Sequence, residues 1–144
     1  MKSLPGKTDA AVAAGYEAAA VLRAGLRLFD RRSEEITRRH GLTARSYELL
    51  LMIKTGREAT GRATPDELER RLQLAKSTVA ELLQRNEDQG LITRALHPSR
   101  RGAITIGLTR KGARRLEAAF IELGSERDRL ADTLRQPLYE QTEP

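Results

Sequence analysis

The chain has 144 residues, of which 26 are lysine or arginine and 20 are aspartate or glutamate, so its formal net charge is +6. This length suits one domain, and the positive charge favours nucleic acid or an anionic surface as partner. The chain has no cysteine, which excludes disulfides, thiolate metal sites and thiol-based redox sensing. Long apolar runs and a signal-peptide core are both missing from the sequence, so we expect a soluble cytoplasmic protein with no membrane partner.

The first long pattern predicts an amphipathic helix that follows a short flexible tail, residues 1–8. Within residues 12–40, apolar side chains recur at steps of three, four or seven, and charged side chains mostly occupy the other positions. Gly15 and Gly25 lie inside this pattern and each costs roughly 1 kcal/mol relative to alanine, so the early turns are expected to bend or fray. Gly41 ends the helix.

A second helix is predicted to begin after Thr43, which is a suitable N-cap. The run Leu49–Ile53 is apolar on every side, so this helix is expected to be buried all round in the centre of the core. The following residues, 55–64, are rich in glycine and threonine and are expected to form a loop.

Two further helices have the spacing of a helix-turn-helix. Thr64 can cap the first of them, Pro65 suits its first turn, and Glu67 completes a capping box. In the second helix Val79 and Leu82 face inward together with Leu83. The residues left on its outer and leading surface are Lys76, Ser77, Thr78, Glu81, Gln84 and Arg85.

Residues 92–106 read as two short strands around a turn, with Arg100 and Arg101 at the tip. In the second strand, apolar Ile104, Ile106 and Leu108 alternate with Thr and Gly, which predicts a half-buried strand. Seven basic residues and no acidic residue lie between Asp88 and Glu117, so the hairpin stands in a segment whose charge suits phosphates. These basic residues are Arg94, Arg100, Arg101, Arg110, Lys111, Arg114 and Arg115.

The last helical region starts after Thr109 and carries an apolar stripe through residues 116–138, which Gly124 and Ser125 divide before Pro137. Together with the first helix, it offers more apolar surface than one winged domain can bury. A two-fold homodimer is the simplest way to bury the excess.

These elements predict a mainly α fold with a small β-hairpin, arranged as a winged helix-turn-helix with N- and C-terminal dimerisation helices. We expect residues 9–144 to form a single winged-helix unit. In this unit, residues 9–40 and 110–138 would supply the dimerisation helices, and residues 43–108 the DNA-binding region.

The order of these motifs resembles the MarR family of bacterial transcriptional regulators over about residues 10 to 138. The resemblance rests on Gly41-Leu-Thr-Ala-Arg-Ser-Tyr, Lys76-Ser-Thr-Val, Gly90-Leu-Ile, His97-Pro-Ser-Arg-Arg-Gly and Leu108-Thr-Arg-Lys-Gly. It implies a homodimeric winged-helix repressor whose recognition helices enter successive major grooves and whose wings reach minor grooves. It also implies that a small aromatic or anionic effector releases the DNA.

The sequence departs from the family pattern at several positions. Arg100 stands where the family usually has an acidic residue before the key wing arginine, so a family salt bridge is lost. Asn86 replaces an apolar core residue of the recognition helix. Glu69 and Gln73 stand near positions where the family prefers alanine and glycine, so the turn between the two helices is expected to be atypical.

The candidate residues for binding DNA are chosen by reach and charge. Wing arginines can enter a minor groove or bind phosphate, and hydroxyl and amide side chains of the recognition helix can reach base edges. Thr64, at a helix N-terminus, is expected to donate to phosphate. The full candidate set is Thr64, Lys76, Ser77, Thr78, Glu81, Gln84, Arg85, Arg94, Ser99, Arg100 and Arg101.

Other site residues have weaker patterns. His40 and Tyr47 lie where an effector could bind, although His40 on an apolar stripe is equally read as a core histidine with a satisfied partner. His97 opens the wing turn and is expected to be structural or to lie near phosphate. The chain has 2 histidines, far apart, and no metal-ligand spacing, so we expect no enzyme activity and no cofactor.

Two alternatives from other classes stay open. A basic protein that coats RNA or DNA without reading its sequence has the same charge, but aromatic residues make up 3% of the chain and none interleaves with the basic segment. The base-stacking surface of single-strand binders is therefore missing, and double-stranded DNA is favoured. An interaction module that keeps the winged fold would be insensitive to removal of Arg100 and Arg101.

Overall fold

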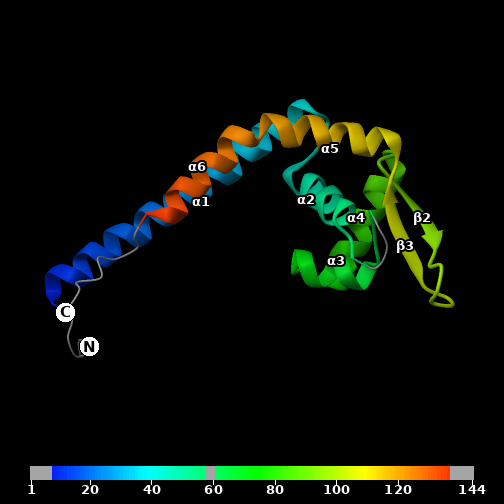
Figure 1. Ribbon diagram of the computed structural model, residues 1–144, viewed down its shortest axis with the longest axis horizontal. Coiled ribbons are helices and arrows are strands. Elements are labelled where there is room, and N and C mark those ends of the chain that lie inside the picture. The colour runs from blue at the N-terminus through cyan, green and yellow to red at the C-terminus, as the bar shows by residue number, and fades with distance from the viewer. Residues whose placement is uncertain (1–7, 58–60, 137–144) are drawn as a thin grey trace. The chain divides into compact units, whose positions relative to one another are not determined.

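The computed structural model describes residues 8–57 and 61–136, and in these ranges the chain forms six α-helices and three short β-strands (Figure 1). In chain order they are α1 (Asp9–Arg39), α2 (Ala44–Lys54), β1 (Arg62–Ala63), α3 (Pro65–Leu72), α4 (Lys76–Asp88), β2 (Ile92–Leu96), β3 (Ile104–Leu108), α5 (Arg110–Glu122) and α6 (Gly124–Arg135). The expected tail lies outside the described residues except for Thr8, and so does Pro137.

The chain divides into two compact units, which we call the helical unit and the winged unit. The helical unit combines the residues up to Ser33 with those from Leu123 onward, and the winged unit is Glu34–Glu122. The division at Leu123 confirms that the C-terminal apolar stripe is split near Gly124, because α5 belongs to the winged unit and α6 to the helical unit.

In the helical unit, α6 lies along α1 (Figure 1). A Cβ atom at Gly25 would lie 3.0 Å from Thr133 Cγ2, so the glycine allows the two helices to approach closely. Glu126 is buried and adds an ion pair, with its Oε1 3.6 Å from Arg32 NH1. The helix α1 continues through both of its inner glycines, so it does not fray there, and Gly25 has a packing role.

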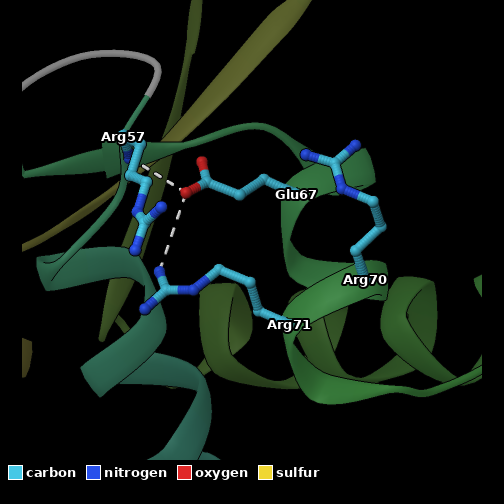
Figure 2. Close-up of a pocket in the computed structure, with 4 residues that line it drawn as sticks. All are labelled: Arg57, Glu67, Arg70 and Arg71. Carbon is cyan, nitrogen blue, oxygen red and sulfur yellow. Dashed lines mark hydrogen bonds and ion pairs between the residues drawn. The ribbon is translucent and has the colours of Figure 1, made fainter.

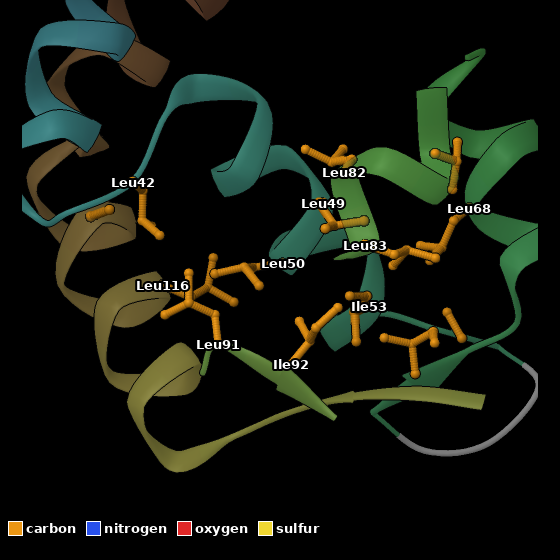
Figure 3. Close-up of a cluster of buried hydrophobic side chains, with 14 residues drawn as sticks. Leu42, Leu49, Leu50, Ile53, Leu68, Leu82, Leu83, Leu91, Ile92 and Leu116 are labelled. Atoms are coloured by element: carbon orange, nitrogen blue, oxygen red, sulfur yellow. The ribbon is translucent and has the colours of Figure 1, made fainter. Parts of the chain in front are cut away.

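In the winged unit, α2 crosses the hydrophobic core (Figure 3). Thr43 caps this helix as predicted, since its Oγ1 accepts a hydrogen bond from the Ser46 N–H. Within the run Leu49–Ile53, three residues are fully buried and two are half-buried, so the expected burial on all sides is partly confirmed. The buried core consists of Leu42, Leu49, Leu50, Ile53, Ala63, Leu68, Val79, Leu82, Leu83, Leu91, Ile92, Ile106, Leu116 and Ala119.

The sheet is antiparallel with strand order β1-β3-β2, and its register pairs Ile92 with Leu108 and Leu96 with Ile104. The two strands of the hairpin are confirmed. The short strand β1 was not predicted, because two residues are too few to give a periodic signal.

The prediction that β3 is half-buried was wrong. Thr105 is 1% exposed and Gly107 is also buried, so both faces of the strand are covered. The cover is Arg62, whose Nε donates to Thr105 Oγ1 at 2.9 Å. A side chain at Gly107 would displace the Arg62 guanidinium from its position over the strand.

The helix-turn-helix is formed by α3, a short turn and α4. Thr64 Oγ1 accepts from the Glu67 N–H, but the Glu67 carboxylate turns away from Thr64 and accepts from the Arg57 N–H at 2.9 Å, so the predicted capping box is only half formed. Gln73 ends α3 in the left-handed conformation, with φ 54° and ψ 44°. Glycine adopts this conformation without steric cost, whereas glutamine does not. A glutamine at this position therefore confirms the prediction of an atypical turn.

Candidate nucleic-acid interface

The helix α4 presents a polar face because its other face fills the core. Val79, Leu82 and Leu83 are at most 4% exposed, as predicted. On the opposite side Lys76, Ser77, Glu81, Gln84 and Arg85 are exposed, whereas Thr78 is half-buried. An exposed row of hydroxyl, amide and cationic groups on a helix is suited to base edges and phosphates.

The start of α4 leaves backbone donors for a ligand. Its N-cap residue is Ala75, which provides no side-chain hydrogen bond to the first turn. The N–H groups of that turn point along the helix axis and carry the positive end of its dipole. Together with Lys76 they suit a phosphate oxygen.

A polar residue is buried beneath this face. Asn86 is 0% exposed, and its Nδ2 donates to the Leu82 carbonyl at 2.8 Å. The Oδ1 atom has no hydrogen-bond partner among the residues that the structure describes. Asn86, which stands where the family pattern has an apolar residue, therefore places a polar group on the buried face of α4 and not on its surface.

The wing turn, residues 97–103, is organised by a histidine. The Nδ1 atom of His97 accepts hydrogen bonds from the backbone N–H groups of Ser99 at 3.0 Å and Arg100 at 2.9 Å. Gly102 completes the turn with φ +79°. The prediction of a structural role for His97 is confirmed, and the turn presents exposed Ser99, Arg100 and Arg101 at its surface.

Several candidate residues also have contacts within the fold, among them Gln84, whose Nε2 donates to Asp88 Oδ1 at 2.9 Å. The Nε atom of Arg94 donates to Glu87 Oε2 at 2.5 Å, which links β2 to α4. Thr64 is 4% exposed and serves as the N-cap of α3, so it does not share the open surface of α4 and the wing. The roles of Arg94 and Thr64 in binding DNA stay predictions. Both residues also have structural roles.

The basic first turns of α5 also contact the fold. The Nζ atom of Lys111 donates to the Gln89 carbonyl at 2.9 Å, and NH1 of Arg115 donates to the Gly41 carbonyl at 3.3 Å. Arg110 and Arg114 are exposed. Two of these four basic residues thus bond to backbone carbonyls outside α5.

His40 has a partner at the far end of α5. Its Nε2 lies 2.5 Å from Glu122 Oε2, and NH1 of Arg39 donates to Glu122 Oε1. The hydrogen bond with His40, together with the charges of Arg39 and His40, lowers the pKa of Glu122 from its ordinary value. The reading of His40 as a satisfied histidine is confirmed, while the effector role of His40 and Tyr47 stays a prediction.

The described residues provide neither a metal-binding cluster nor a membrane-spanning helix. No three His, Cys, Asp or Glu side chains gather in a group able to hold a metal ion. No helix in this part of the chain is long and apolar enough to cross a membrane.

Comparisons with known proteins agree with this geometry. The model of the MarR family matches residues 40–101. MarR from E. coli in its apo form is similar in structure, with a TM-score of 0.67 and 21% identity, over 82% of this chain and 85% of that chain. A mutant of MarR from E. coli, complexed with operator DNA, has a TM-score of 0.67 and 22% identity, over 82% of each chain.

A third similar structure is AbsC, a MarR family transcriptional regulator from Streptomyces coelicolor. Its TM-score is 0.71 at 22% identity, over 95% of this chain and 86% of that chain. A search of curated protein sequences gave no significant match. The chain therefore has the fold of the MarR structures, and residues 40–101 match the model of the MarR family.

Proposed function

We propose that this protein is a cytoplasmic transcriptional regulator that binds a specific sequence of double-stranded DNA as a homodimer. The observation that carries the proposal is the exposed polar face of α4 in the same winged unit as a wing turn that bears two exposed arginines. The match of residues 40–101 to the MarR family model, and the likeness of the fold to a MarR protein that was crystallised with operator DNA, support it.

In this proposal α4 reads the major groove. Ser77 and Thr78 near its start contact base edges or phosphate, and Gln84 and Arg85 reach bases or backbone further along. Lys76 and the uncapped first turn hold a phosphate. The half-buried position of Thr78 restricts it to contacts near the helix start.

The wing contributes the second contact. Arg101 and Arg100 extend from a turn whose backbone is arranged by His97, so the charged groups are presented by an ordered hairpin. A minor groove narrowed by A·T base pairs deepens the negative potential that attracts arginine. The wing therefore adds affinity and a preference for DNA shape.

Apolar surface on the helical unit supports a homodimer. Tyr16 is 70% exposed and Leu134 56% exposed, and Val21 and Leu28 are exposed as well. A second copy would cover these side chains by two-fold symmetry. Residues 9–40 and 110–138 are the proposed dimerisation helices, and residues 43–108 the DNA-binding region. A two-fold dimer requires a pseudo-palindromic operator with half-sites roughly 34–36 Å apart.

Repression and response to an effector complete the proposal, and both rest on the resemblance to the MarR family. A dimer bound across a promoter would block transcription, and a small aromatic or anionic molecule near His40 and Tyr47 would release it. Thermal shift of the protein with aromatic carboxylates tests the effector site. No shift with the wild type, or an equal shift in His40→Ala, would remove that part of the proposal.

Selection of duplexes from a random library, followed by mobility shift at physiological salt, tests the main proposal. We expect the selected operator to bind roughly 10³-fold tighter than random duplex, with the mass of a dimer by light scattering. Equal, salt-sensitive binding to any duplex or to RNA would favour the alternative of a non-specific coating protein.

A further inference from the structure

A pocket of about 520 Å³ in the winged unit is lined by four charged residues outside the surface described above (Figure 2). Arg57 follows α2, whereas Glu67, Arg70 and Arg71 belong to α3. Three guanidinium groups surrounding one carboxylate leave an excess of positive charge, which favours an anionic ligand.

Part of this cluster already has a structural role. NH1 of Arg71 donates to the Met52 carbonyl at 2.9 Å, and its NH2 donates to Thr55 Oγ1 at 2.8 Å. These bonds hold α3 to the C-terminal end of α2. The Oε1 atom of Glu67 accepts from the Arg57 N–H and lies 3.6 Å from Arg71 NH1. Arg71 and Glu67 thus balance each other's charge.

Three groups of the pocket remain for a ligand. Arg57 and Arg70 are exposed, and the guanidinium group of each has several N–H donors. The third group is Glu67 Oε2, which has no hydrogen-bond donor among the residues that the structure describes. It is covered in this structure, so a ligand reaches it only after a small movement of the surrounding side chains. The Glu67 side chain is 4% exposed. A buried carboxylate oxygen without a donor is unfavourable, so a ligand that supplies a proton there is favoured.

We propose that this pocket binds hydrogen phosphate. Two of the phosphate oxygens accept hydrogen bonds from Arg57 and Arg70, and the P–O–H group donates to Glu67 Oε2. An anion and a carboxylate repel each other unless a proton lies between them. The pocket therefore selects an oxyanion that carries a hydroxyl at neutral pH.

The same chemistry excludes two similar anions. Sulfate has the shape of phosphate but no proton at neutral pH, and the phosphodiester of a DNA backbone has none either. Each would place an unprotonated oxygen against Glu67 Oε2. A site built around a ligand hydroxyl discriminates strongly against an analogue that lacks it, because its polar atom is left unpaired.

Calorimetric titration of the full chain with sodium phosphate and with sodium sulfate, at pH 7 and equal ionic strength, tests the proposal. We expect phosphate to bind at least roughly tenfold tighter than sulfate. Arg57→Gln and Arg70→Gln should each weaken phosphate binding roughly tenfold. Arg45→Gln, at an exposed arginine of α2 outside the pocket, is the matched control and should leave it unchanged.

Glu67→Gln tests the selectivity directly. It should narrow the ratio of phosphate to sulfate affinity to about one, because the amide nitrogen can donate to either anion. Since Glu67 also holds the Arg57 backbone, circular dichroism must show that this variant is folded. If it is not folded, the two arginine variants and the wild-type affinity ratio decide the question.

Equal affinity for phosphate and sulfate, or phosphate binding that is the same in Arg70→Gln and Arg45→Gln, would overturn the proposal. A second contrary outcome is a loss of DNA affinity in Arg57→Gln and Arg70→Gln when the wild type does not bind free phosphate. That result would assign the pocket to the DNA backbone. Phosphate binding is measured without DNA, so its failure leaves the proposed regulatory function intact.

Discussion

The wing turn and the first turns of α5 both concentrate arginine and lysine, but they use that charge differently. In α5, Lys111 and Arg115 donate to backbone carbonyls of Gln89 and Gly41. In the wing, Arg101 is exposed on a turn in which His97 Nδ1 accepts hydrogen bonds from two backbone N–H groups. The α5 cations support the fold, whereas the wing presents its charge outward.

The difference shows that basic composition does not by itself mark a binding surface. Gln89 is the C-cap of α4 and Gly41 follows the end of α1, so the α5 cations lie near helix C-termini. Cations there bond carbonyls that lack helical partners and complement the helix dipole. A cationic side chain can contact DNA through its N–H donors only where backbone carbonyls do not already accept hydrogen bonds from them.

The largest expected effect is on the wing. Arg101→Ala should raise the Kd for operator DNA about 10- to 100-fold, because it removes a cation that contacts a groove or phosphate. The slope of log affinity against log salt should also fall by about one unit. Mobility shift at several salt concentrations measures both quantities. Unchanged affinity would remove Arg101 from the interface.

Arg115→Ala should have the opposite pattern. The loss of its bond to Gly41 should lower the free energy of unfolding by about 1 kcal/mol and leave DNA affinity unchanged. Urea denaturation gives the first quantity and mobility shift the second. Arg114→Ala, one residue away and exposed, is the control and should alter stability much less. If both variants lose DNA affinity equally, α5 belongs to the interface and the comparison fails.

A third prediction concerns the order of the wing. His97→Ala removes the acceptor for two backbone N–H groups, so we expect a looser turn and DNA affinity lower by about threefold to fivefold, or roughly 1 kcal/mol. His97→Asn should restore most of the affinity, because an asparagine oxygen accepts from the same positions in turns. Equal affinities in the two variants would show that the histidine acts in another way.

The smallest effect is expected at the other end of α5. Because the pKa of Glu122 is lowered in the folded state, its ionised form adds stability above its ordinary pKa of 4.5, and this is lost as pH falls through the folded-state pKa. The Tm of the wild type should therefore exceed that of Glu122→Gln at neutral pH, and the difference should shrink on acidification. Thermal melts from pH 7 to about 3 measure it. A Tm difference independent of pH would exclude this linkage.

Local sequence signals predicted the parts of this fold that depend on neighbouring residues. The Thr43 cap, the inward face of α4 and the hairpin around Arg100 each follow from short-range spacing, and each is confirmed. The break between α5 and α6 was predicted from Gly124 in the same way. Periodicity is informative here because each helix or strand has one apolar face to bury.

Features that depend on distant residues escaped prediction. Arg62 covers Thr105 and Gly107, so β3 is buried on both faces although its sequence alternates. Glu67 contacts Arg57 instead of completing a capping box, and the same contact builds the proposed phosphate pocket. Arginine reaches partners far along the chain, so its role cannot be read from spacing.

Local sequence patterns predict the helices, the hairpin, the inner and outer faces of α4, and the concentration of positive charge at the wing. Capping, periodicity and composition are local properties, and they need no knowledge of the partner segment. Which cations remain available to a ligand depends instead on how distant segments pack together. Packing brings carbonyls and carboxylates from remote elements within hydrogen-bonding distance of some arginines and leaves others in solvent.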